Sequence, residues 1–207
     1  MVSERGDGGR AEQATAAELL QRLGAAGASP RQVGRLTALF ARPAVGARSV
    51  LIEGMLDPAA GLVGDNWRER GSRRTADGRA HTEMQLTLME ARVLAAVAGH
   101  PSRFALAGDQ LIVDFALDPA HVPPGTEVAI GDAIVVITAV PHLGCAKFAE
   151  RFGPAALALV QSPEGRARNL RGVYARVVRG GCVRVGVPIR RISQAPAPPA
   201  EVSHPHG

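Results

Sequence analysis

A cysteine, a histidine and two basic side chains fall within one short stretch of this chain, the segment PHLGCAKFAERFG (141–153). We expect this segment to form a loop and then a short helix that begins beside Cys145. The positive end of that helix, together with Lys147 and Arg151, favours a thiolate over a thiol, because each places positive charge near the sulfur. A thiolate carries sulfur or binds a soft metal. Cys145 is therefore the predicted catalytic residue, with His142 tuning the thiol.

The alternative for Cys145 is a small buried hydrophobe, which is the usual state of an unpaired cysteine. Its surroundings favour function, because Gly144 allows close approach of a backbone and Lys147 is the only lysine in the chain. A lysine presents a compact, mobile charge to an anion, although its presence in an arginine-rich chain is equally explained by chance. The other cysteine, Cys182, opens a predicted strand with no basic residue immediately before it, and we interpret it as structural.

Three further arginines, Arg166, Arg168 and Arg171, alternate with other residues in the segment EGRARNLRG (164–172), ahead of a predicted strand. This spacing suits bidentate recognition of a phosphate, and it also suits a solvated sheet edge. We expect Arg168 and Arg171 to stabilise anionic charge together with Arg151. The predicted cofactor-binding residues are Lys147, Arg151, Arg168, Arg171, His142 and Gly144.

The composition indicates one domain of ordinary globular type, because 46% of the 207 residues are hydrophobic and 21% are charged. The net charge is +5, and between residues 145 and 192 ten basic residues face two acidic ones. Aromatic residues make up only 3% of the chain, which supplies a poor platform for stacking bases. The charge therefore favours a phosphorylated small molecule over nucleic acid, with a merely solvated basic surface as the alternative.

Neither a membrane span nor a secretion signal is predicted, since no apolar run approaches about 20 residues and residues 1–13 are polar. We therefore expect a cytoplasmic protein with no membrane partner. The two cysteines form no Cys-x-x-Cys pair, which argues against a disulfide framework and a structural zinc site. The histidines lack metal-ligand spacing, and no phosphate-loop or nucleophile-elbow motif occurs.

Strands dominate the predicted secondary structure. They are expected over residues 33–41, 48–55, 110–115, 127–130, 133–140, 173–179 and 182–189. Two-residue turns at Gly131-Asp132 and Gly180-Gly181 predict two hairpins. Helices are expected over residues 15–24 and 87–97, each opened by a capping box, and over 146–152 and 154–161.

This order of elements indicates a β-rich α+β fold, a barrel or a sandwich decorated by a few helices. One domain is expected over residues 14–193. The ends, residues 1–13 and the proline-rich 194–207, are predicted to be disordered tails, because they offer nothing to bury. The segment GLVGDNW (61–67) is expected to be a loop packed by the only tryptophan.

Several short motifs, each weak alone, occur in one order and together resemble the MOSC domain, named for the C-terminal domain of molybdenum cofactor sulfurases. They are GLVGD (61–65), QLTLM (85–89), LAGDQL (106–111), PPG (123–125), PHLGCAKF (141–148), RFG (151–153), LRG (170–172) and RVV (176–178). The resemblance implies a MOSC-like β-barrel with one characteristic cysteine, here Cys145. In the family this cysteine is proposed to carry sulfur as a persulfide or to contact molybdenum bound to its pterin.

The resemblance also implies a cofactor and partners. The cofactor is molybdenum cofactor (molybdopterin), with Cys145 as a molybdenum ligand. Large sulfurases carry a cysteine desulfurase domain for which this chain leaves no room. The sulfur donor is therefore expected to be a separate cysteine desulfurase with its own pyridoxal phosphate, and the acceptor a molybdenum or metal-sulfur enzyme.

Three functions follow, in order of preference. The first is a protein that binds molybdenum cofactor, or carries sulfur as a persulfide on Cys145, or does both. The second is a stand-alone molybdenum-dependent reductase of N-oxygenated small molecules, with Cys145 ligating the metal. The third is a non-enzymatic basic adaptor. Any catalysis is expected to be sulfurtransferase-like or dependent on molybdenum cofactor.

Overall fold

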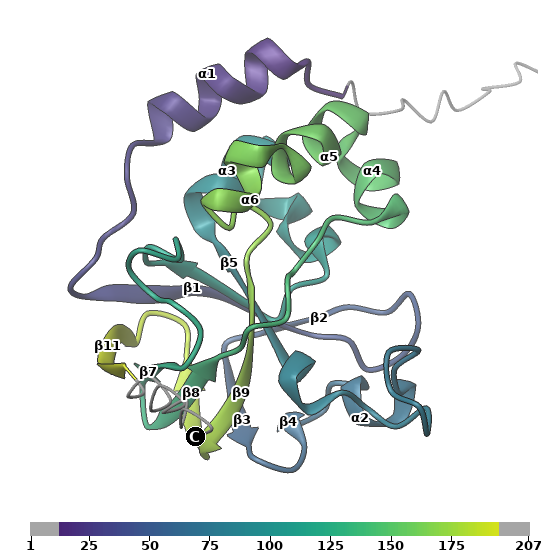
Figure 1. The fold of residues 1–207 in the computed structure, drawn as a ribbon, viewed down its shortest axis with the longest axis vertical. Coiled ribbons are helices and arrows are strands. Elements are labelled where there is room, and N and C mark those ends of the chain that lie inside the picture. Colours follow the sequence, from purple (N-terminus) through teal and green to yellow (C-terminus); the bar gives the residue numbers. More distant parts are fainter. Residues whose placement is uncertain (1–12, 195–207) are drawn as a thin grey trace, which may run out of the picture.

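Seven strands close into a barrel in the computed structural model, which describes residues 13–194 (Figure 1). In barrel order they are β11 (Pro188–Gln194), β7 (Thr126–Ile130), β8 (Ala133–Ile137), β9 (Val173–Arg179), β5 (Leu86–Glu90), β6 (Leu111–Asp114) and β1 (Gly34–Ala41). The pairing of β11 with β1 completes the circuit, and β5 and β6 form its parallel pair. The predicted β-rich barrel with a few helices is confirmed.

The barrel closes around side chains that alternate between its interior and its outer surface. In β7, Thr126, Val128 and Ile130 are buried, while the two residues between them are partly exposed. Leucine, valine and isoleucine side chains from the seven strands meet inside as one apolar core. The hairpin predicted at Gly131-Asp132 is confirmed, because β7 and β8 pair directly from Ile130 and Ala133 outward.

Two predicted strands are each divided between two sheets. Residues 48–55 contribute β2 (Ser49–Leu51), which pairs with β1, and β3 (Glu53–Asp57), which lies in a separate sheet with β4 (Gly61–Leu62) and β10 (Gly181–Arg184). Residues 182–189 are divided in the same way between β10 and β11. A turn at Gly186, with φ of 95°, separates these last two strands.

The hairpin predicted at Gly180-Gly181 is wrong, because β10 pairs with β3 and not with β9. A Cβ atom on Gly181 would lie 2.6 Å from the carbonyl carbon of Asp132. This glycine is therefore required by the close passage of two backbone segments, and its sequence pattern is the same as that of a tight turn.

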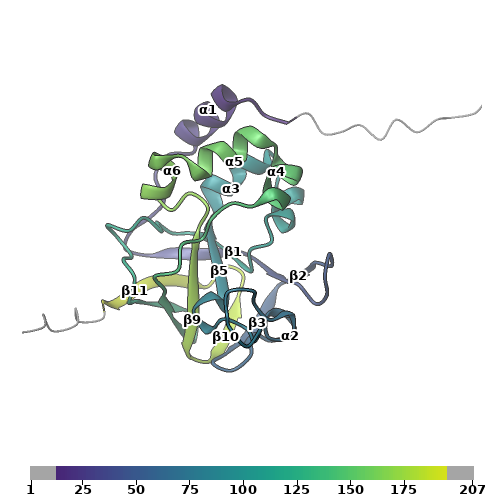
Figure 2. The same cartoon turned by 45° about the vertical axis from the view of Figure 1, so that its right-hand side comes forward.

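Helices gather at one end of the barrel (Figures 1 and 2). They are α1 (Ala16–Ala26), α3 (Ala91–Ala98), α4 (Ala146–Phe152), α5 (Pro154–Gln161) and α6 (Pro163–Ala167). A second apolar core, which includes Leu19, Leu94 and Phe152, fills the space between these helices and the barrel. The short α2 (Trp67–Arg70) lies apart from this layer, and 3-10 turns cover Thr82–Met84 and Pro101–Ala107.

Three of the four predicted helices are confirmed. Thr15 and Glu18 form both hydrogen bonds of the capping box that opens α1. The helices α4 and α5 lie where the sequence places them, with Pro154 in the first turn of α5. The short α6 was not predicted, and it is opened by the Ser162 side chain, which accepts a hydrogen bond from the Gly165 amide.

The helix predicted over residues 87–97 begins too early, because Thr87 and Glu90 belong to strand β5. The Thr87 hydroxyl donates to the Gln110 side chain, and Glu90 accepts hydrogen bonds from the Ser29 hydroxyl and the Leu117 amide. These long-range partners replace the local bonds of a capping box. The helix starts at Ala91.

The two predicted tails lie outside the described residues, apart from Gln13 and Gln194. Gln194 is the last residue of β11. Within residues 13–194, no helix has the length and apolar character needed to cross a membrane.

Candidate functional site

Two adjoining cavities lie between the loops that carry Arg42, Gly108 and Arg171, which line both of them together with Arg70. The thiol lobe, of about 260 Å³, is lined further by Cys145, Lys147, Phe148, Arg151, Arg48, Asn66, Ala107 and residues 44–46. The histidine lobe, of about 200 Å³, is lined further by His142, Tyr174, Trp67, His81, Met84, Thr87, Gly71 and Ser72. We call the two lobes together the cleft.

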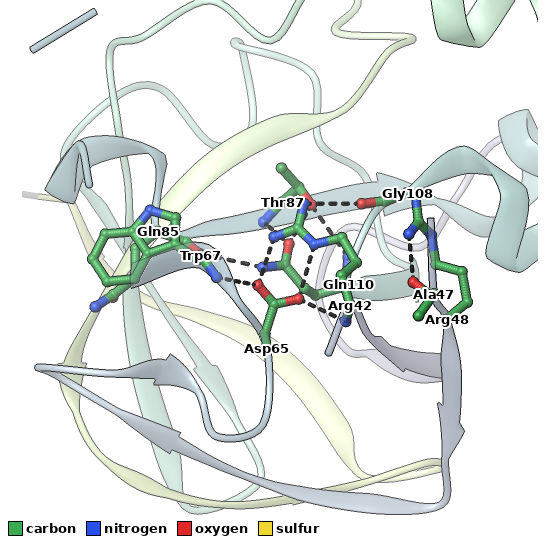
Figure 3. Close-up of polar contacts among 9 residues, drawn as sticks. All are labelled: Arg42, Ala47, Arg48, Asp65, Trp67, Gln85, Thr87, Gly108 and Gln110. Atoms are coloured by element: carbon green, nitrogen blue, oxygen red, sulfur yellow. Dashed lines mark hydrogen bonds and ion pairs between the residues drawn. The ribbon is translucent and has the colours of Figure 1, made fainter. Parts of the chain in front are cut away.

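Arg42 is fixed at the junction of the lobes by a buried ion pair with Asp65 (Figure 3). The carboxylate accepts from Nε and Nη2 of Arg42 at 2.8 and 2.9 Å, and also from the backbone amides of Arg42 and Trp67. Arg42 Nη1 donates to the Gly108 carbonyl at 3.2 Å. Four donated bonds hold the fully buried carboxylate, so the guanidinium is locked in one position.

Arg171 is the second fixed cation of the cleft. Its Nη1 donates to Asp109 Oδ2 at 2.7 Å, and its Nη2 donates to the Ala107 carbonyl at 3.1 Å. The guanidinium also lies over the Phe148 ring, 4.8 Å from its centre. Burial raises the pKa of the Asp109 carboxyl, and the Arg171 charge opposes that shift.

His142 is packed into the histidine lobe beside this ion pair. Its ring lies 4.4 Å from the ring of Tyr174, and its Nδ1 lies 3.8 Å from Asp109 Oδ1. Both of these atoms are buried and without a hydrogen-bond partner. Burial, reinforced by the charges of Arg171, Arg42 and Arg74, lowers the pKa of His142 well below its ordinary value, so the imidazole is neutral at pH 7.

Cys145 is the N-cap residue of α4, and it is exposed in the thiol lobe. Its side chain makes no capping hydrogen bond, so the sulfur is not engaged in holding the helix. Lys147 lines the same lobe from the first turn of α4, and Arg151 lines it from the last turn. Arg151 Nη1 donates to the Leu106 carbonyl at 2.7 Å, which orders this side chain.

The thiol lobe has an excess of positive charge. Six basic residues line it and no carboxylate does, within the part of the chain that is described. Two of the six, Arg42 and Arg171, have buried carboxylate partners, whereas Arg48, Arg70, Lys147 and Arg151 form no ion pair with a described residue.

Crowding of these cations appears in their pKa values. Burial lowers the pKa of Arg48, and the nearby charges of Arg151 and Arg42 lower it further. The pKa of Arg70 is lowered by burial and by Arg42. The Nε atoms of Arg48 and Arg171 are buried with no acceptor. Such a lobe is suited to an anion that supplies the missing acceptors.

Four of the predicted site residues come together in the thiol lobe: Cys145, Lys147, Arg151 and Arg171. His142 lies instead in the adjoining lobe, where Asp109 and Tyr174 surround it. The expectation that His142 lies beside the thiol and tunes it receives no support from this placement.

Arg168 and Gly144 do not belong to the lining of either lobe. Arg168 is exposed beyond α6, pairs with Glu164 at 3.3 Å and borders a different cavity. Gly144 contacts α5, where a Cβ atom would lie 2.4 Å from Leu157 Cδ1. Its carbonyl accepts from the Gln161 side chain at 2.7 Å. This glycine therefore serves packing.

Sequence reasoning missed the basic residues Arg42, Arg48 and Arg70 and the carboxylates Asp65 and Asp109. The predicted loop around Trp67 contained the available signal, because the tryptophan is buried there and Asp65 stands just before it. An acidic residue followed by a buried aromatic suggests an internal carboxylate that requires a cationic partner. Nothing in the sequence identified Arg42 as that partner.

No group of three or more histidine, cysteine, aspartate or glutamate side chains is placed to hold a metal ion among residues 13–194. In the thiol lobe, the soft donor among the described lining residues is the thiol of Cys145. Cys182 is also exposed, but it lies in β10, away from both lobes.

The family model of the MOSC domain matches residues 65–190, which is more than half of the chain. The chain therefore belongs to the MOSC domain family. All of α4 and both of its predicted functional cations lie inside the matched segment, whereas Arg42 and Arg48 precede it.

Solved structures show the same fold at low sequence identity. The YUAD protein from Bacillus subtilis matches with a TM-score of 0.57 and 16% identity, over 78% of this chain and 96% of that one. YiiM from Escherichia coli matches with a TM-score of 0.50 and 18% identity, over 77% of this chain and 70% of that one. The search of curated proteins finds no match.

Proposed function

We propose that this MOSC-domain protein binds molybdenum cofactor in the cleft, with Cys145 as the protein ligand to the metal. The observation that carries the proposal is the thiol lobe itself, in which an exposed thiol shares a cavity with six basic residues and no carboxylate. Membership of the MOSC domain family supports the same assignment.

The residues of the lobe fit the chemistry of this cofactor. Its phosphate is an anion, and Arg48, Arg70, Lys147 and Arg151 line the lobe without an ion pair to a described residue. Cys145 would supply a soft thiolate ligand to its metal. Arg42, Arg48, Arg70, Lys147, Arg151 and Arg171 are the residues that would hold the anionic part.

When bound, the cofactor supplies two-electron chemistry at its metal. The chain contributes the position and the charge. Arg42 and Arg171, each fixed by a buried carboxylate, keep their orientation when the cleft is empty, so little ordering is needed on binding. Lys147 and Arg48 would break no ion pair with a residue of the described part of the chain when they meet the anion.

A second function, the carriage of sulfur as a persulfide on Cys145, is favoured by the exposure of this thiol. In such a step the Cys145 thiolate attacks the outer sulfur of a persulfide on a donor protein. The donor's S–S bond breaks, its cysteine leaves as a thiolate, and a new S–S bond forms at Cys145. The partners implied are a pyridoxal-phosphate-dependent cysteine desulfurase as donor and a molybdenum or metal-sulfur enzyme as acceptor.

The proposal is tested by purifying the chain without reductant from cells that make the cofactor, and measuring molybdenum, pterin and the intact protein mass. We expect about one molybdenum and one pterin per chain in the wild type, and loss of molybdenum in Cys145→Ala. Cys182→Ala is the matched control, because that cysteine is also exposed but lies outside the cleft. A mass increase of one sulfur atom on Cys145 without molybdenum would instead establish the carrier.

A further inference from the structure

The histidine lobe contains a pair of titratable groups that the proposed metal site does not use. Asp109 Oδ1 and His142 Nδ1 face one another at 3.8 Å, which is too long for a hydrogen bond, and neither has another partner. Their side chains are 0% and 6% exposed to bulk solvent. Two unpaired polar atoms in such a place are costly, and the cost points to a role in the site.

The arrangement defines the orientation of the imidazole. Asp109 is held by Arg171, so its free oxygen is fixed opposite Nδ1 of His142. A carboxylate oxygen only accepts, which favours the tautomer with hydrogen on Nδ1. Nε2 is then an acceptor, and it makes no hydrogen bond to a described residue although His142 lines the lobe. At 3.8 Å the Asp109 carboxylate acts on the ring through its charge, and a hydrogen bond that orients the imidazole would require the two atoms to move closer.

The charges around His142 connect it to ligand binding. The positive charges that lower its pKa are Arg171 before β9, Arg42 after β1 and Arg74 beyond α2. Asp109, before β6, and Tyr174, in β9, face the ring. His81 and Arg70 line the same lobe. Arg42 and Arg171 line both lobes. An anion bound to these shared arginines offsets their repulsion of a second positive charge and so favours a proton on the imidazole.

We propose that His142, oriented by Asp109, is the proton-transfer residue of the cleft, which takes up a proton when an anion binds and presents it from Nε2 to the molecule in the histidine lobe. This inference rests on the proposed anion site in the thiol lobe. It assigns the second lobe to the reacting partner of that site, a small molecule with an oxygen or nitrogen atom to be protonated. No redox step is included, because only a proton moves.

The test uses sulfate as the probe, because it neither gains nor loses a proton between about pH 5 and 7, where a histidine titrates. Calorimetry of sulfate binding in two buffers of different ionisation enthalpy gives the number of protons taken up. We expect the wild type to take up a substantial fraction of one proton per sulfate. His142→Gln is expected to take up no proton when sulfate binds. Its affinity for sulfate is expected to stay within about threefold of the wild type, a smaller change than the roughly tenfold loss expected when one ion contact is removed.

A second measurement does not depend on any variant. In nitrogen-correlated NMR spectra of the ligand-free wild type, His142 is expected to show the neutral tautomer with hydrogen on Nδ1, and sulfate is expected to shift its titration midpoint upward. Sulfate binding without proton uptake, or uptake that persists in His142→Gln, would overturn the inference and leave the anion site standing. Failure of the wild type to bind sulfate would overturn both the anion site and the role of His142. Hydrogen on Nε2 in the free protein would overturn the tautomer assignment and the orienting role of Asp109, and would leave the anion site standing.

Discussion

The two lobes of the cleft share Arg42, Arg70, Gly108 and Arg171, yet they differ in what surrounds these residues. In the thiol lobe the added ionisable groups are the Cys145 thiol and the side chains of Arg48, Lys147 and Arg151, and these cations form no ion pair with a described residue. In the histidine lobe the added residues of the described chain include no arginine or lysine, and burial lowers the pKa of His142 and raises that of Tyr174. Under the proposed function, the same arginines would bind an anion on one side and supply a fixed electrostatic field on the other.

The buried carboxylates hold the arginines that line both lobes. Asp65 and Asp109 are fully buried, and each orients one shared arginine. Buried ion pairs contribute little net stability, but the loss of one partner leaves an uncompensated charge. Substitutions in these ion pairs are expected to disturb both lobes. Substitution of Arg48 or Lys147, which line the thiol lobe and not the histidine lobe, is expected to affect the thiol lobe alone.

The largest effect is expected from Asp65→Ala, which leaves Arg42 buried without its carboxylate. We expect the free energy of unfolding to fall by about 3–5 kcal/mol, measured by urea denaturation. Glu53→Ala is the control, because it breaks an ion pair with Arg184 whose side chains are more than half exposed, and it should cost at most about 1 kcal/mol. Equal losses from the two substitutions would show that Asp65 does not support the cleft.

Arg48→Met is expected to affect the thiol lobe alone. Sulfate affinity should fall about tenfold, since one charged donor is lost, while proton uptake per bound sulfate should stay the same. Without sulfate the melting temperature should rise slightly, because a crowded and partly desolvated cation is removed. Arg168→Met, outside both lobes, should change neither quantity. An unchanged affinity for Arg48→Met would remove this residue from the anion site.

His142→Gln is expected to change the pH dependence of stability. The pKa of His142 is lowered in the folded state, so below its ordinary value of about 6.5 the unfolded chain binds more protons and stability falls with falling pH. The wild type should lose up to about 1.4 kcal/mol per pH unit from this group, a slope that His142→Gln abolishes. A wild-type slope in His142→Gln would contradict the assignment.

The smallest effect concerns the two cysteines. Both are exposed, so accessibility does not distinguish them, and any difference in reactivity comes from their surroundings. We expect Cys145 to react with iodoacetamide several-fold faster than Cys182 at neutral pH, and Lys147→Ala to reduce that difference. Sulfate should slow Cys145 alone. Equal rates in the wild type, measured by peptide mass spectrometry, would mean that the basic lining does not activate the thiol.

The sequence predicted the parts of the fold that depend on local patterns. The Thr15 capping box, the Gly131-Asp132 turn and the proline in the first turn of α5 act through neighbours a few residues away, and all three appear as expected. Thr87 and Gly181 carry the same local signals, but their bonds and contacts come from Gln110 and Asp132. Long-range contacts decided these positions, and a local pattern does not contain them.

The candidate site shows the same division. Cys145, Lys147 and Arg151 were predicted together because a loop and one helix turn bring them together. Arg42 and Arg171 lie far apart in the chain, and the strand order β9-β5-β6-β1 brings them together beside Gly108 and Asp109. Arg168 was predicted from its spacing alone, and the turn that follows α6 directs it away from the cleft. The order of the strands was therefore needed to decide which of these charged residues line the cleft.

The central claim is that Cys145 and the thiol-lobe cations hold a molybdenum cofactor, and the most direct measurement is diffraction at the molybdenum absorption edge from crystals of protein purified from cofactor-producing cells. We expect one anomalous peak bonded to Sγ of Cys145, with the phosphate of the pterin on Arg48, Arg171 or Lys147. Molybdenum present in the crystals but bound away from Cys145, or a pterin outside the two lobes, would contradict it.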